Sequence, residues 1–184
     1  MRVIAGEFRS RRLKAVPGFD TRPTPDRLRE ALFNVLQSRI EGCVFLDAYA
    51  GTGAVGIEAV SRGAAQAILI EKSRDAMEII EENVKSLGIE AKCRVLRGSA
   101  QLLLPRHPAD IVFLDPPYDH PKEYEICLQI LGDTAPSLVV VQHHPKQLLP
   151  ESPGAITRYR TLTQGDNALS FYQTDDGRNE HYQS

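Results

Sequence analysis

Long hydrophobic runs are absent from this sequence of 184 residues, and cysteine is scarce. No apolar stretch approaches the roughly 20 residues that a membrane-spanning helix needs, so we expect no membrane partner. The N-terminal residues show no long apolar stretch of the secretory type, and we expect no secretory signal. The three cysteines, Cys43, Cys93 and Cys127, are odd in number and widely spaced, which fits neither a disulfide framework nor a zinc site. These absences predict a globular protein of the reducing cytoplasm.

Metal-ligating clusters are also missing from the sequence. Of its five histidines, the adjacent His143 and His144 would point to opposite sides of a strand and could not easily bind one ion. His120 could contact a substrate. Polar loop positions explain these histidines best, and we expect no metal.

Neither sign of charge is in large excess, because the formal net charge is only −2. The charge is uneven along the chain, however. Residues 1–29 carry eight basic and three acidic side chains, a net charge of +5, and the remaining residues carry −7. A basic segment on an acidic body indicates a polyanionic partner, although a solvated tail explains the charge alone equally well.

From residue 43 onward, strand-like and helix-like segments alternate. The expected strands are Cys43–Asp47, Gln66–Glu71, Lys92–Arg97, Asp110–Asp115 and Ser137–Gln142. The expected helices are Gly53–Arg62, Ser73–Leu87, Ala100–Leu104 and Glu123–Leu131. Repeated βα units of this kind predict a doubly wound, mostly parallel sheet. Ile156–Thr163 and Ala168–Thr174 flank a turn signal and predict a closing antiparallel hairpin. The expected fold class is therefore α/β, a seven-stranded Rossmann-like sheet.

The N-terminal 40 residues form an extension to this core. Arg2–Gly6 and Arg11–Val16 could pair as a small basic hairpin, and a helix is expected to start with Thr24 as its N-cap and Pro25 in its first position. We expect one domain over residues 1–184 and a monomer. Its parts are the basic hairpin and helix (1–40), the catalytic α/β core (41–174) and a polar tail (175–184).

A glycine-rich turn follows the first expected strand. Gly51, Gly53 and Gly56 satisfy the G-x-G-x-x-G spacing of a nucleotide-cofactor loop, and Glu71 ends the next strand, where an acid binds ribose hydroxyls. Asp47 would repel a pyrophosphate and attract the ammonium and sulfonium of S-adenosylmethionine. No Lys or Arg lies in this loop to pair with phosphates. The pattern therefore favours S-adenosylmethionine over NAD.

The apolar run Ile111–Leu114 is followed by Asp115, Pro116, Pro117 and Tyr118. This tetrapeptide stands at the carboxyl end of an expected strand, where open α/β sheets bind ligands. The Asp115 carboxylate and the Pro116 carbonyl can each accept one N–H of an aromatic amine. The two prolines make the turn rigid, and Tyr118 offers a face on which a base can stack. The tetrapeptide is therefore the expected catalytic site, suited to holding a planar amino group during a reaction.

Taken in this order, the glycine loop, the ribose acid and the tetrapeptide resemble class I methyltransferases that modify exocyclic amino groups. The stretches Arg22–Asn34 and Gly165–Tyr172 are similar to the RsmD family, the bacterial 16S ribosomal RNA guanine-N2 methyltransferases. The resemblance implies S-adenosyl-L-methionine as cofactor and 16S rRNA as partner, within the small subunit or an assembly intermediate. The cofactor-binding residues that it implies are Asp47, Tyr49, Ala50, Gly51, Thr52, Gly53, Glu71, Lys72, Ser99, Ala100 and Asp115.

Two positions depart from the family pattern. Ser99 stands where many such enzymes have Asp or Asn for the adenine amino group, and a hydroxyl is a shorter, weaker partner. Gln142 stands where Glu is expected after the fifth strand. Neither departure removes a reacting group.

The basic segment fits RNA better than DNA. A nucleobase must be reached outside its stack, and the chain has no second domain that would read a DNA sequence. The expected phosphate-binding residues are Arg2, Arg9, Arg11, Arg12, Arg22, Arg27 and Arg29. Two alternatives stay open: an adenine-N6 or cytosine-N4 methyltransferase acting on DNA or another RNA, and an oxidoreductase or non-catalytic RNA-binding module.

Overall fold

A computed structural model describes residues 1–15 and 25–174 of the chain. The chain divides into two compact units, Met1–Ser99 and Ala100–Ser184. This division does not coincide with the expected boundary after residue 40, and the single domain over residues 1–184 stays a prediction. The expected tail (175–184), Arg22, and the proposed N-cap Thr24 lie outside the described residues.

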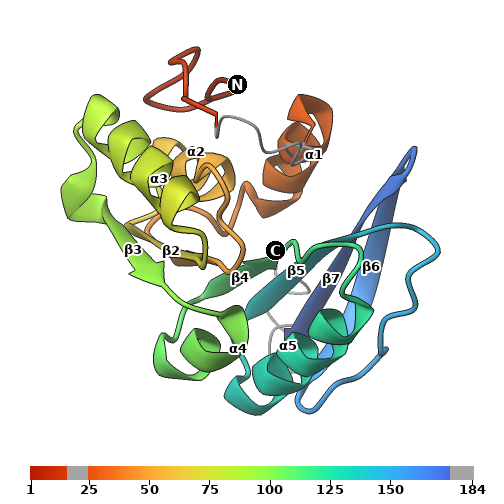
Figure 1. The fold of residues 1–184 in the computed structure, drawn as a ribbon. Coiled ribbons are helices and arrows are strands. Elements are labelled where there is room, and N and C mark those ends of the chain that lie inside the picture. The colour runs from red at the N-terminus through yellow and green to blue at the C-terminus, as the bar shows by residue number, and fades with distance from the viewer. Residues whose placement is uncertain (16–24, 175–184) are drawn as a thin grey trace. The chain divides into compact units, whose positions relative to one another are not determined.

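Three parallel strands form the sheet of the first unit. They are β1 (Val44–Asp47), β2 (Gln66–Glu71) and β3 (Cys93–Arg97), in the order β3-β2-β1. Helices α2 (Ala54–Ser61) and α3 (Arg74–Leu87) cover one face of these strands (Figure 1). Strands β1 and β2 are apolar and almost wholly buried, as expected for parallel strands.

Local signals set the ends of α3. The Ser73 hydroxyl accepts a hydrogen bond from the Ala76 amide at 3.4 Å, and Gly88 ends the helix in the left-handed conformation. Both caps are as predicted. A single turn of 3-10 helix, η1 (Glu90–Lys92), then leads into β3.

Helix α1 (Asp26–Leu36) begins one residue later than expected. Pro25 itself is the N-cap, and its carbonyl accepts hydrogen bonds from the amides of Leu28 and Arg29. The expected placement of Pro25 inside the helix is therefore wrong. The helix buries Leu28, Leu32, Phe33 and Leu36, and the ring centroids of Phe33 and Phe45 in β1 are 6.1 Å apart.

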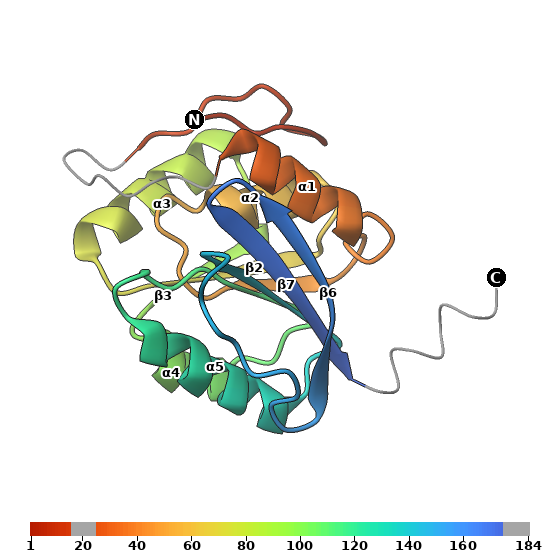
Figure 2. The ribbon, with the colours of Figure 1, turned by 90° about the vertical axis from the view of Figure 1, so that its right-hand side faces the viewer.

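Residues 1–15, here called the N-terminal arm, pair with themselves without forming regular strands. One isolated bridge joins Arg2 and Arg12, and the Leu13 amide donates to the Met1 carbonyl at 3.0 Å. The expected hairpin is thus a loop with one bridge. Val3 and Leu13 are buried in the same apolar cluster as Ile57 of α2 and side chains of α3, and Figure 2 shows the arm over these helices. This packing does not fit a solvated tail.

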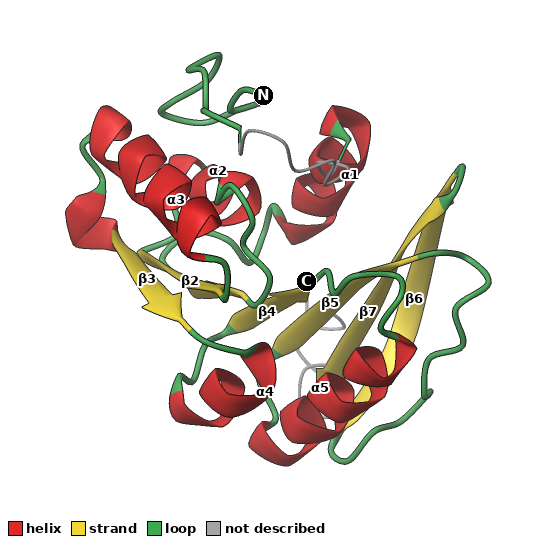
Figure 3. Ribbon diagram, in the orientation of Figure 1, coloured by secondary structure: helices red, strands yellow, loops and turns green. Residues whose placement is uncertain are grey.

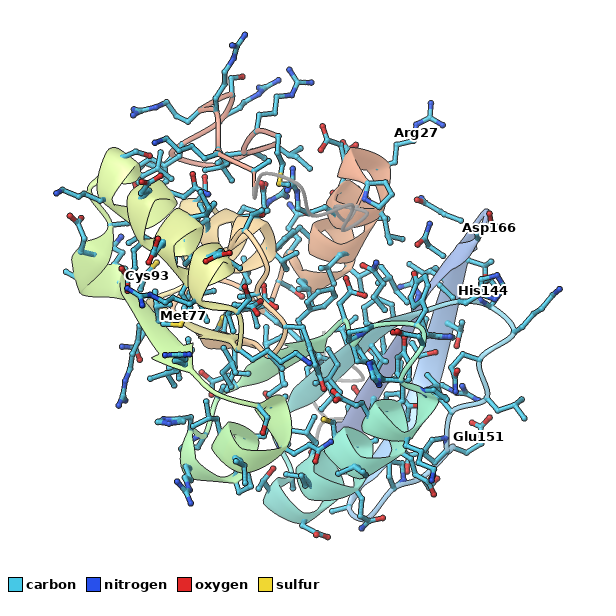
Figure 4. The ribbon with its side chains drawn as sticks, viewed as in Figure 1. Arg27, Met77, Cys93, His144, Glu151 and Asp166 are labelled. Atoms are coloured by element: carbon cyan, nitrogen blue, oxygen red, sulfur yellow. The ribbon has the colours of Figure 1, made fainter. Side chains whose placement is uncertain are left out.

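The second unit has four strands, in the order β4-β5-β7-β6. Strands β4 (Ile111–Leu114) and β5 (Leu138–His143) are parallel, whereas β7 (Asn167–Thr174) is antiparallel to both β5 and β6 (Ile156–Gln164). The predicted hairpin is confirmed, with Asp166 at its tip (Figure 4).

Helices α4 (Ala100–Leu103) and α5 (Pro121–Thr134) lie beside each other in the second unit (Figure 3), and η2 (Leu104–Arg106) extends α4. Helix α5 is longer than expected at both ends, because Pro121 serves as its first residue and Ala135 terminates it with a positive φ. Tyr124, Cys127, Leu128 and Leu131 form its buried side.

The expected α/β class, a mostly parallel Rossmann-like sheet with a C-terminal antiparallel hairpin, is confirmed by these elements and their pairing. Within residues 1–15 and 25–174, no helix is both long and apolar enough to cross a membrane.

Candidate active site

The glycine loop connects β1 to α2 in the first unit. Gly53 is the N-cap of α2 with a φ of +78°, a conformation that side chains disfavour. A Cβ at Gly56 would lie 2.1 Å from Cδ2 of Leu69, so this glycine lets α2 approach β2 closely. The loop is tied to the sheet because the Ala50 amide donates to the Ile70 carbonyl at 2.9 Å. The loop backbone is therefore held at the carboxyl ends of β1 and β2.

Glu71 lies beside this loop, as predicted from the spacing. One oxygen of its carboxylate accepts the Gly51 amide at 2.9 Å, and the other accepts the amides of Lys72 and Ser73, both at 2.8 Å. A carboxylate has about four acceptor positions, and three are used here. Binding of two ribose hydroxyls would therefore need at least one backbone bond to be shared or exchanged.

Asp47 is buried at the end of β1, and its carboxylate accepts the Tyr49 amide at 3.4 Å. The pKa of Asp47 is raised to about 7, chiefly by burial. The Glu71 charge also raises it, and the hydrogen bonds from the Tyr49 and Gly56 amides lower it. A cation placed beside Asp47 would favour its ionised form. The site is therefore suited to a positively charged ligand group.

The other predicted cofactor residues fall into two groups. In the first unit, Ala50 and Gly53 are buried, the remaining loop residues are half-buried, and Lys72 and Ser99 are exposed. The Gly98 amide donates to the Glu71 carbonyl at 3.1 Å, which places the start of the Ser99 turn next to the end of β2. In the second unit, Ala100 is buried at the start of α4 and Asp115 is half-buried after β4.

The tetrapeptide Asp115–Tyr118 is held from two directions within the second unit. The hydroxyl of the buried Tyr124 in α5 donates to the Pro116 carbonyl at 3.3 Å. The Tyr118 hydroxyl donates to Oδ1 of Asn167, at the start of β7, at 3.0 Å. Burial, aided by the charge of Asp115, raises the pKa of Tyr124, so its hydroxyl keeps the proton that it donates. These contacts give the Pro116 carbonyl and the Tyr118 ring defined positions.

Sequence reasoning missed Tyr124 and Asn167 as residues of this site. Asn167 lies in the stretch Gly165–Tyr172, whose similarity to the RsmD family does not by itself assign a role to any of its residues. Tyr124 belongs to the apolar side of α5 and no motif marks it. The family-like stretch around Asn167 was a sequence signal for that residue. The role of Tyr124 depends on how α5 packs against the tetrapeptide, which no local pattern predicts.

The predicted phosphate-binding arginines that the structure describes differ in location and exposure. Arg2, Arg9, Arg11 and Arg12 are exposed on the N-terminal arm. Arg27 is exposed on α1 and its side chain extends away from the helix (Figure 4). A cavity of about 400 Å³ lies between the arm, α1 and Arg62, with Arg2 and Arg9 among its lining residues.

Arg29 does not fit its expected role. Its side chain is fully buried and its Nη2 donates to the Arg2 carbonyl at 2.6 Å and to Asp26 at 3.0 Å. Its Nε lies 4.0 Å from Glu58, which is also buried. Arg29 anchors α1 to the arm from inside, so its guanidinium is not exposed for a phosphate.

In the described ranges, 1–15 and 25–174, no group of three or more His, Cys, Asp or Glu side chains could hold a metal ion. His143 instead packs inside the second unit, where its Nε2 is 2.8 Å from the Ser170 hydroxyl. The absence of a metal stays a prediction.

Comparison with known proteins gives matches along nearly the whole chain. YlbH of Bacillus subtilis, named provisionally as an rRNA methyltransferase, is 33% identical over 184 residues, which cover 94% of this chain and 98% of YlbH. Ribosomal RNA small subunit methyltransferase D of Escherichia coli is 34% identical over 181 residues, which cover 95% of this chain and 90% of the relative.

A solved structure has the same fold. The Escherichia coli protein yhhF, named provisionally as a methyltransferase, superposes with a TM-score of 0.82 and 34% identity, covering 95% of this chain and 97% of yhhF. The family described as conserved hypothetical protein 95 matches residues 1–173. The chain therefore belongs to this family, in agreement with the RsmD-like resemblance of its motifs.

Proposed function

We propose that this protein transfers a methyl group from S-adenosyl-L-methionine to the exocyclic N2 amino group of a guanine in 16S rRNA. Its family relatives are rRNA methyltransferases by name, which supports the coarser activity of rRNA methylation with this donor. The observation that carries the proposal is the held tetrapeptide, with a half-buried carboxylate next to a carbonyl whose position Tyr124 sets, which supports transfer to an exocyclic amine. The choice of guanine N2 among such amines follows from the resemblance to the RsmD family.

The donor half of the reaction belongs to the first unit. Glu71 would bind the ribose hydroxyls, and the backbone of Ala50–Gly53 would pack along the methionine part of the cofactor. The ionised form of Asp47 would pair with the ammonium group, and the ligand charge would offset the burial that now raises its pKa.

The acceptor half belongs to Asp115 and Pro116. The guanine N2 lone pair is delocalised into the ring, so the free amine attacks poorly. Two acceptors that bind its two N–H bonds favour a pyramidal nitrogen with its lone pair directed at the methyl carbon. When bound, S-adenosyl-L-methionine would supply the methyl group and S-adenosyl-L-homocysteine would be the leaving group, while the nitrogen would lose its proton to Asp115 or to water.

The RNA would lie on the basic surface of the N-terminal arm and α1, which carries Arg2, Arg9, Arg11, Arg12 and Arg27. These side chains are exposed, and the arm itself is packed on the core of the first unit. A fixed array of cations holds phosphates with less loss of chain entropy than a flexible tail would. An rRNA substrate also implies that the protein works in the cytoplasm, with the small subunit or its assembly intermediates.

The direct test is transfer of labelled methyl groups to small ribosomal subunits, naked 16S rRNA and DNA, followed by digestion to nucleosides. We expect label in N2-methylguanosine from a ribosomal substrate. Label in N6-methyladenine or N4-methylcytosine would support the alternative amine substrates instead. S-adenosyl-L-homocysteine, but not NADH, should raise the melting temperature, whereas the reverse would support an oxidoreductase.

The catalytic role of Asp115 has its own test. The variant Asp115→Ala should lose methyl transfer by at least about 10²-fold while it keeps its melting temperature, because one of the two N–H acceptors is gone. The control is Asp119→Ala, an exposed acid in the same loop, which should keep its activity. Near-normal turnover of Asp115→Ala would refute the assigned role.

A further inference from the structure

One buried side chain joins the N-terminal arm to the glycine loop. Asn83 of α3 is 1% exposed, and its amide group makes three hydrogen bonds outside its own helix. Its Oδ1 accepts the Lys14 amide at 2.7 Å, while its Nδ2 donates to the Lys14 carbonyl at 3.1 Å and to the Thr52 carbonyl at 3.0 Å. The arm and the loop are far apart in sequence and share this single side chain as a partner.

On the arm side, Asn83 acts as a substitute peptide. It binds both backbone groups of Lys14, in the way that a neighbouring strand would, and so fixes the end of the arm. The other end is close to the loop as well, because the Thr52 hydroxyl lies 3.6 Å from the Met1 sulfur. Between these ends, Val3 and Leu13 share an apolar cluster with Ala50 and Ala54.

On the loop side, Asn83 sets the direction of one peptide plane. The Thr52 carbonyl that it binds belongs to the same peptide as the Gly53 amide, which donates to the Ala50 carbonyl at 2.7 Å. A change in the loop backbone would therefore strain or break the Asn83 bond. Helix α3 begins at Arg74, three residues after Glu71, whose carboxylate binds the Gly51 amide. Both contacts with the loop therefore come from the end of β2 and the helix that follows it.

We propose that Asn83 is a positioning residue that couples the basic arm to the cofactor loop, so that cofactor binding stabilises the packed position of the arm and RNA on the arm strengthens cofactor binding. The inference rests on the proposed function, because it assumes the cofactor on the loop and RNA on the arm. The coupling must be reciprocal, since each ligand stabilises the arrangement that the other needs.

The coupling can be measured with S-adenosyl-L-homocysteine alone, by amide hydrogen exchange of the full chain with and without this ligand. In the unaltered protein, the ligand should slow exchange of the arm amides Val3, Ser10 and Leu13 by at least about 5-fold, in addition to that of the loop amides. Slower exchange in the loop with unchanged exchange in the arm would overturn the inference. No change anywhere, with no binding, would instead speak against the proposed cofactor.

Two variants sharpen the result. In Asn83→Ala the ligand should still protect the loop, with affinity lower by about 10-fold, and its effect on the arm should disappear. In the control Glu82→Ala, which removes only the exposed ion pair between Glu82 and Lys14 at 2.9 Å, the coupling should persist. Persistence of the arm effect in Asn83→Ala would contradict the inference. If Asn83→Ala does not fold, the exchange data on the unaltered protein still decide the question.

Discussion

Asp47 is the clearest case of a single residue whose surroundings prepare it for a ligand. It is a carboxyl group buried beside a second acid, and its pKa of about 7 lies well above the ordinary value of 3.8. Between about pH 4 and 7 the folded chain therefore holds a proton at Asp47 that the unfolded chain has lost. Stability must fall as the pH rises through this window, and the loss is complete above pH 7.

The variant Asp47→Asn should reverse this loss. At pH 8 its melting temperature should be several degrees above that of the unaltered protein, because each kcal/mol of added stability raises it by about 2–4 °C. At pH 4 the two melting temperatures should nearly coincide. Its affinity for S-adenosyl-L-homocysteine should fall, because an amide does not attract an ammonium group. Thermal unfolding and calorimetric titration check both results. The exposed Asp75→Asn is the control, and a destabilised Asp47→Asn at pH 8 would contradict the expectation.

Among the elements, the hairpin β6–β7 has a part in the site that its edge position does not suggest. Its Asn167 holds the Tyr118 hydroxyl at 3.0 Å, and its Ser170 hydroxyl bonds to His143 of β5. The hairpin thus orients the ring on which we expect the target base to stack.

Because Tyr118→Phe and Asn167→Ala remove the same hydrogen bond, their effects should not add. Each single change should lower kcat/KM for RNA by about 2- to 10-fold, mainly through KM, and the double variant should be no worse. Methyl-transfer kinetics measure this double-mutant cycle, with Asp166→Ala at the hairpin tip as control. Fully additive losses would show that the two residues act separately.

Helix α2 anchors the arm through the buried Glu58. Its carboxylate accepts the amides of Ile4 and Ala5 at 2.7 and 2.9 Å and pairs with Arg62 at 2.8 Å. It is also 4.0 Å from the buried Arg29. Burial lowers the pKa of Arg29 overall, and the charge of Glu58 offsets part of this lowering. The helix therefore contributes one acid that joins the arm, α1 and the end of α2.

Replacing Glu58 by Ala should destabilise the protein by about 3–5 kcal/mol, because it removes the acid beside the buried Arg29 and the half-buried Arg62 and leaves two backbone amides without their acceptor. Denaturant unfolding measures the loss. The control Lys14→Ala, which removes an exposed ion pair with Glu82, should cost less than about 1 kcal/mol. If Glu58→Ala lowered the free energy of unfolding by as little as Lys14→Ala does, the buried Glu58 contacts would not be needed for stability.

At the scale of the whole molecule, the separation of charge predicts how RNA binding depends on salt. The chain has a net charge of only −2, yet its first 29 residues carry +5. Replacing Arg9, Arg11 and Arg12 by Ala should weaken RNA binding and reduce the slope of log affinity against log salt by about 0.7–0.9 for each phosphate that the arm no longer binds. The control replaces three exposed cations elsewhere, Lys85, Lys92 and Arg94, and should leave the slope unchanged. An unchanged slope in the arm variant would refute this surface.

Local sequence signals predicted much of the fold because they act within a few residues. The Ser73 and Gly88 caps and the hairpin turn are set by neighbouring atoms, and these predictions are confirmed. Signals that depend on distant partners were less reliable. The arm formed one bridge instead of two strands. The start of α1 was wrong by one residue for a local reason, because Pro25 is the N-cap instead of the first helical residue.

The sequence by itself determined the order of βα units, the glycine loop, the acid one strand later and the tetrapeptide after β4, because each follows from periodicity and spacing. The tertiary structure decided which polar side chains are buried and which groups they bind. It buried Arg29, whose guanidinium binds the arm, and it brought Asn83 into hydrogen bonds with Lys14 and Thr52. It also directed the Tyr124 hydroxyl at the Pro116 carbonyl. The Arg29 and Asn83 contacts join residues far apart in the chain, and the Tyr124 contact depends on how α5 packs against the tetrapeptide. Only packing selects among the many partners that a sequence permits.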